Sequence, residues 1–146
     1  MTQPRRDLWP EDLGSTIKEI APVTILKEQA SLLGQRTKNI VKAEVGSSVN
    51  PQDYVIDVFY LVAPALNNYK FALFEIRHSI EQLYPVTIAS GTLNINVKIA
   101  TEDELLDKLE QVLSHEKTIR IIESMLAQSG AGPSQAPFKQ VTRQLN

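Results

Sequence analysis

Apolar residues recur every three or four positions in the first part of the chain, which is the spacing of a helix that buries one face. The first stripe follows Pro10 and predicts a short helix over residues 10–20. The second predicts a helix that begins at residue 22 and ends at Gly34 or Lys38. The first stripe consists of Leu13, Ile17 and Ile20, and the second of Ile25, Leu26, Ala30, Leu32 and Leu33.

Between Ile40 and Ile99 the apolar residues alternate with polar ones, which indicates strands with one solvent-exposed face. The second of these strands is apolar on both faces apart from Asp57, as expected for the middle of a sheet. Asn67 and Asn68 predict a hairpin turn, because asparagine tolerates a positive φ. The predicted strands cover residues 41–49, 54–62, 69–78 and 93–99, and residues 84–89 either extend the third of them or form a separate edge strand.

The chain returns to helical spacing after the strands. Thr101 and Glu104 match a capping box, in which the two side chains satisfy backbone donors at the start of a helix. The segment from Thr101 to Gln128 is either two helices that meet near Ser114 or one bent helix. Since no helix separates the strands, they pair antiparallel. The sequence therefore predicts an α+β fold: a four- to five-stranded antiparallel meander sheet flanked by N-terminal and C-terminal amphipathic helices.

The composition fits one globular domain. The chain has 146 residues, of which 42% are hydrophobic, and a net charge of -2, so we expect no nucleic-acid partner. It has no cysteine, which excludes thiolate nucleophiles and cysteine-ligated metal sites. No apolar run is long enough to span a membrane, and we expect a cytoplasmic protein. We predict a flexible arm at residues 1–9, one α+β domain at 10–129 and a flexible tail at 130–146.

Asp57 is the one charged residue in its predicted strand and needs a partner if it is buried. One hypothesis joins it to Glu75 and Arg77 on the neighbouring strand, with His78 nearby, as a magnesium site of a metal-dependent nuclease or phosphodiesterase. The alternative is that Asp57 reaches solvent or pairs with a basic residue across the sheet. The two histidines, His78 and His115, lack the spacing of metal ligands, so we assign no metal and no cofactor.

Isolated apolar side chains near both ends suggest contacts with a partner. Trp9 stands in the predicted arm, and Phe138, Val141 and Leu145 are spaced as one face of a short helix within a polar tail. The tail either binds a partner, docks on its own domain or stays disordered. One sheet face is a further docking surface if all helices pack on the other, and it carries Lys42, Glu44, Asn94, Asn96 and Lys98.

Basic residues Arg36, Lys38 and Lys42 cluster where the second helix passes into the first strand. They either contact an acidic partner or phosphate, or simply complement the helix dipole. The sequence thus favours a non-enzymatic interaction or regulatory module, such as an adaptor, inhibitor or accessory subunit, that binds another protein through a sheet face, an edge strand or its terminal segments. Homo-oligomerisation stays open. The alternatives are the nuclease and a small-ligand domain whose pocket is lined by Tyr54, Tyr60, Phe71 and Tyr84.

Overall fold

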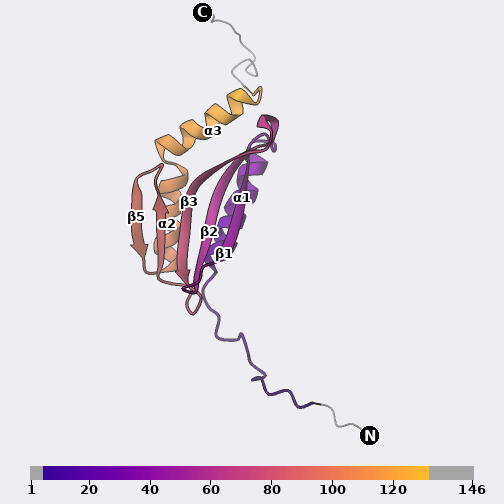
Figure 1. Cartoon of the computed structure of the whole chain (residues 1–146), viewed down its shortest axis with the longest axis vertical. Coiled ribbons are helices and arrows are strands. Elements are labelled where there is room, and N and C mark those ends of the chain that lie inside the picture. Colours follow the sequence, from indigo (N-terminus) through magenta and orange to yellow (C-terminus); the bar gives the residue numbers. More distant parts are fainter. Residues whose placement is uncertain (1–4, 132–146) are drawn as a thin grey trace, which may run out of the picture.

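Five antiparallel strands form one sheet, in which each strand pairs with its neighbours in sequence, in the order β1-β2-β3-β4-β5 (Figure 1). The computed structural model describes residues 5–131. This confirms the α+β meander with helices before and after the strands. Its elements are α1 (Pro22–Arg36), β1 (Lys42–Val49), β2 (Tyr54–Ala63), the 3-10 helix η1 (Pro64–Leu66), β3 (Tyr69–Ser79), β4 (Val86–Ser90), β5 (Ile95–Ile99), α2 (Glu102–Leu113) and α3 (Glu116–Gln128).

The structure tests the predicted turn and the predicted strands of the meander. Asn67 and Asn68 have φ values of 62° and 56°, so the predicted asparagine turn between β2 and β3 is confirmed. Residues 86–90 form a strand of their own, which settles the alternative left open by the sequence. The middle strand is β3, whereas β2 is the interior strand next to it. The apolar composition of β2 therefore reflects side chains that are buried on the face covered by the helices and mostly half-buried on the other face.

The helices cover one face of the sheet, and the core lies between them. Alternation along β2 turns Phe59, Leu61 and Ala63 toward the helices, and each is at most 1% exposed. Figure 1 shows α1 and α2 running alongside the strands, while α3 crosses the end of the sheet. Further core residues come from every layer: Ile25 and Leu26 of α1, Ile76 of β3, Ile88 of β4, Leu105 and Leu109 of α2, and Met125 of α3.

The C-terminal segment is two helices with a corner between them. The Glu104 amide donates to Thr101 Oγ1 at 3.2 Å, and the Glu104 carboxylate accepts from the Ala100 amide at 3.0 Å. These two bonds form a capping box at the start of α2, in which the carboxylate reaches the residue before the N-cap instead of the N-cap itself. Ser114 ends α2 by donating to Glu110 O, and His115 caps α3 by accepting from the Lys117 amide. No helix within residues 5–131 is both long enough and apolar enough to cross a membrane.

The helix expected over residues 10–20 is not present. Residues 11–16 form turns, and Leu13 and Ile17 are 70% and 72% exposed. The reason is that so short a helix is marginal unless its apolar stripe is buried, and here the stripe packs on no other element. Ile20 joins this segment to the domain, because its amide donates to Glu102 and its carbonyl accepts from the Tyr84 hydroxyl.

Candidate functional site

Asp57 lies on the helix-covered face of the sheet and is 1% exposed. It stands directly opposite Ser47 of β1, whose hydroxyl donates to Asp57 Oδ1 at 2.6 Å. The second carboxylate oxygen, Oδ2, is buried and has no hydrogen-bond partner among the described residues. Asp57 thus neither reaches solvent nor pairs with a basic residue, and its one hydrogen-bond partner among the described residues is the neutral Ser47 hydroxyl.

The register separates Asp57 from the residues with which the nuclease hypothesis joined it. Asp57 pairs with Ile76, so Glu75 and Arg77, on either side of Ile76, point to the opposite face. There Arg77 donates to Glu75 at 2.6 Å, and the two side chains form an ion pair. His78 is on the covered face, where Nδ1 lies 2.8 Å from the carbonyls of Ser79 and Gln82. Within residues 5–131 no three histidines or carboxylates converge as a metal site.

The other candidates from the sequence are equally dispersed. Tyr54 and Tyr60 lie on the open face of the sheet, whereas Phe71 and Tyr84 lie on the covered face, so these aromatics line no common pocket. Trp9 is 74% exposed. The tail residues Phe138, Val141 and Leu145 lie outside the described residues.

The face opposite the helices is open, as the sequence suggested. Lys42, Glu44, Asn96 and Lys98 are exposed on it, whereas Asn94 lies in the turn before β5 with φ of 56°. Lys70 on the same face forms an ion pair with Glu44 at 2.8 Å, and this contact raises the pKa of Lys70. The centre of this open face is half-buried and apolar, formed by Ile56, Val58 and Tyr60.

The outer edge of β1 offers unpaired backbone groups. The Asn50 amide donates to Tyr54 O at 2.9 Å, which fixes the ladder: even-numbered β1 residues bond to β2, and odd-numbered ones turn their N–H and C=O groups outward. Val41 confirms this parity, because the Thr37 hydroxyl donates to its carbonyl at 2.6 Å and accepts from its amide at 3.2 Å. Thr37 thereby closes the edge at its first position.

Beyond Val41 the edge is open. The outward N–H and C=O groups of Ala43, Val45 and Ser47 have no hydrogen-bond partner in the part of the chain that the structure describes. Backbone groups of this kind need a partner, either water or another strand. These three residues therefore present a preformed template for an added strand.

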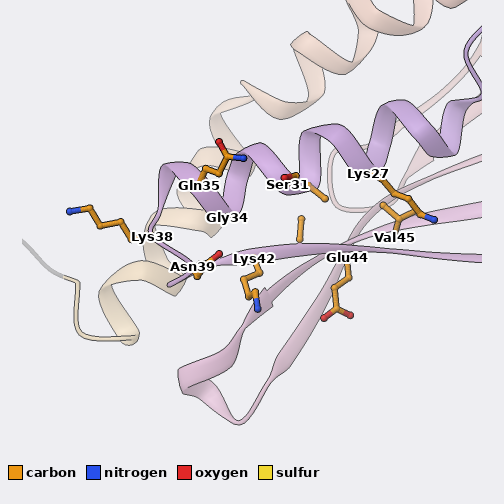
Figure 2. A pocket seen from close by; sticks show the side chains of 11 residues that line it. Lys27, Ser31, Gly34, Gln35, Lys38, Asn39, Lys42, Glu44 and Val45 are labelled. Carbon is orange, nitrogen blue, oxygen red and sulfur yellow. The ribbon is translucent and has the colours of Figure 1, made fainter.

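A groove of about 600 Å³ runs between this edge and α1 (Figure 2). On the helix side it is lined at helical spacing by one stripe of α1 that continues just past its end, and the residues in the middle of that stripe are small. On the strand side it is lined by residues 42–45. The helix stripe consists of Lys27, Ala30, Ser31, Gly34, Gln35 and Lys38, followed by Asn39.

The groove is basic at both ends. Lys27 extends from α1 toward Val45, and Lys38 lies at the opposite end, beyond the last turn of α1 (Figure 2). Lys42 and Glu44 leave β1 on the side away from α1. Glu44 is the one carboxylate that lines the groove, and it is engaged by Lys70. The side of the groove next to α1 therefore carries two lysines and no acidic residue.

The opposite edge of the sheet is a weaker template. β5 has five residues against eight in β1. The groove between β5 and α2 has a volume of about 260 Å³, and its charges are mixed, since Glu104 and Asp107 accompany Lys98 and Lys108. The edge of β1 is thus the longer, roomier and electrostatically more uniform of the two.

Comparison of the chain with protein-family models, with curated proteins and with solved structures found no match. A function for this protein is therefore inferred from the geometry of the β1 edge. Sequence reasoning flagged Lys38 and Lys42 but missed Lys27, Ser31 and Gly34. The signal was present, because residues 27, 31, 34 and 38 recur at helical spacing without a large apolar side chain among them.

Proposed function

We propose that the chain is a non-enzymatic protein-interaction module that binds an extended segment of a partner protein as an additional strand along β1. The observation that carries this proposal is the run of outward backbone groups at Ala43, Val45 and Ser47 beside an open groove. Strand addition is a recurring mode of peptide recognition, in which backbone hydrogen bonds supply affinity and neighbouring pockets supply specificity.

The edge is long enough to hold a peptide. Each of the three outward residues presents one donor and one acceptor, and a net gain of about 1 kcal/mol for each bond formed gives a useful contribution from the backbone alone. The groove beside the edge leaves space for alternate side chains of the added strand. The binding energy therefore does not depend on any single side-chain contact.

The charge of the edge favours a different protein over a second copy of this chain. Lys27, Lys38 and Lys42 surround the edge, and two copies joined edge to edge would bring these lysines together. Lysine on an edge strand is a common protection against pairing with an identical edge. A partner segment without that positive charge meets no such repulsion.

The test uses the full-length protein, labelled with 15N, and peptides selected against it from a random library. We expect the selected peptides to shift the amide resonances of Ala43, Val45 and Ser47 more than those of β5. Val45→Pro removes one outward N–H but no bond to β2, so it should keep the fold and weaken binding about fivefold. Val45→Thr keeps the N–H and should bind as the parent does.

Two results would overturn the proposal. One is a set of resonance shifts confined to the open sheet face or to α3. The other is unchanged binding by Val45→Pro when its circular dichroism spectrum matches that of the parent.

A further inference from the structure

We infer that the segment bound at β1 is acidic on the side that faces α1, with two carboxylates four residues apart. The inference rests on the proposed strand addition and specifies its partner. It follows from the charges, the length and the floor of the α1–β1 groove.

The charge of the groove selects the sign. A strand added at β1 turns alternate side chains toward α1, where Lys27 and Lys38 are both exposed. No acidic residue lines this side, because Glu44 projects on the other side and contacts Lys70. Among the described residues Lys27 and Lys38 have no ion-pair partner, so a carboxylate in the groove displaces no existing contact.

The length of the groove selects the spacing. From Lys27 to Arg36, where α1 ends, the helix rises about 14 Å, and Lys38 lies two residues further along the chain. A strand advances about 3.3 Å per residue, so four residues cover about 13 Å and return to the same face. Two carboxylates at positions i and i+4 of the partner therefore reach the two lysines.

The floor of the groove leaves room for the added strand. Ala30, Ser31 and Gly34 form the middle of the helix stripe, and Gly34 is buried. A Cβ at Gly34 would meet Asn39 Oδ1 at 2.9 Å, so the helix and the loop are already in close contact there. No large side chain in the middle of the groove therefore blocks the approach of the added strand to α1.

The experiment compares three peptides that differ only in charge. The first is Thr-Val-Thr-Glu-Val-Ser-Val-Glu-Thr-Val-Thr, and in the others glutamine or lysine replaces both glutamates. Titration into the 15N-labelled full-length protein gives the affinity and the site together. We expect the glutamate peptide to bind about tenfold more tightly than the glutamine peptide, the effect of two exposed ion pairs, and the lysine peptide to bind weakest.

A charge-reversed pair of variants gives the control. The double substitution Lys27→Glu with Lys38→Glu should invert the order, so that the lysine peptide binds most tightly. The double substitution Lys108→Glu with Lys117→Glu changes the net charge equally but lies on α2 and α3, and it should leave the order unchanged. An inversion by both double variants would mean that only net charge matters, and it would overturn the inference.

The outcomes separate the inference from the function on which it rests. If the glutamate and glutamine peptides bind equally and both shift the amides of Ala43 and Val45, strand addition stands and the acidic pattern is refuted. If no peptide shifts those amides at any concentration reached, and peptides selected from the random library also leave them unshifted, the proposed function itself fails.

Discussion

Replacement of Asp57 by valine should stabilise the protein, although it removes the one charged residue of β2. The carboxylate is buried on the helix side of the sheet, between Phe59 and Val55 along the strand and opposite Ile76. Valine favours strands and fits this apolar surface. The question is whether the loss of the bond from Ser47 outweighs the relief of an unsatisfied oxygen.

Three contributions to the free energy of unfolding change when valine replaces Asp57. The bond from Ser47 to Oδ1 involves a charged acceptor, and its loss costs about 1.5–3 kcal/mol. Removing the buried, unpartnered Oδ2 returns about 1–3 kcal/mol, and burying the valine side chain adds about 1.5 kcal/mol. Ser47 is exposed, so its hydroxyl is hydrated once the carboxylate is gone. The net expectation is a stabilisation of about 1 kcal/mol.

Urea denaturation followed by far-ultraviolet circular dichroism measures this difference as a shift of the midpoint at constant slope. Ser47→Ala is the matched control, because it keeps the charge and removes its one partner, and it should destabilise by about 1–3 kcal/mol. In the Asp57→Val background the same Ser47→Ala change should have almost no effect.

A loss of more than about 1 kcal/mol in Asp57→Val, together with a neutral Ser47→Ala, would refute this reasoning. Such a result would mean that Asp57 is stabilised by something other than Ser47. The nuclease hypothesis would then gain ground if magnesium or manganese also raised the melting temperature of the parent but not of Asp57→Asn.

Two further predictions concern Tyr84 and Lys38. Burial, and then the charges of Glu102 and Glu19, raise the pKa of Tyr84 to about 12. The folded state therefore keeps a proton that the unfolded chain loses near pH 10. The free energy of unfolding should fall between about pH 10 and 12 by up to about 1 kcal/mol after allowance for solvent screening. In denaturation experiments, Tyr84→Phe should abolish this part of the pH dependence. Lys38 has φ of 53°, so Lys38→Gly should raise the free energy of unfolding by about 0.5–1 kcal/mol and weaken binding of the glutamate peptide. Lys38→Ala should weaken binding of the peptide without stabilising the fold. Equal stability of the two variants would contradict the role given to this backbone conformation.

The local elements were largely predictable from the amino-acid sequence. Alternation of apolar residues predicted β1 and β5, and a continuous apolar run predicted β2. Asn67 and Asn68 predicted a turn, and Thr101 with Glu104 predicted the start of α2. These features depend on contacts within a few residues, so their physical cause is readable along the chain. The helix expected over residues 10–20 failed because its stability depends on a surface that the rest of the fold does not provide.

Which residues come into contact depends on the strand register and on helix packing. A strand side chain changes face with each residue, so the pairing of Asp57 with Ile76 is what places the carboxylate among the helices and leaves Glu75 and Arg77 on the open face. The groove likewise exists because the small stripe of α1 packs beside the β1 edge, and neither element contains it alone. Register and packing are long-range properties, and they bring Lys27 and Val45 to one surface although 17 residues lie between them.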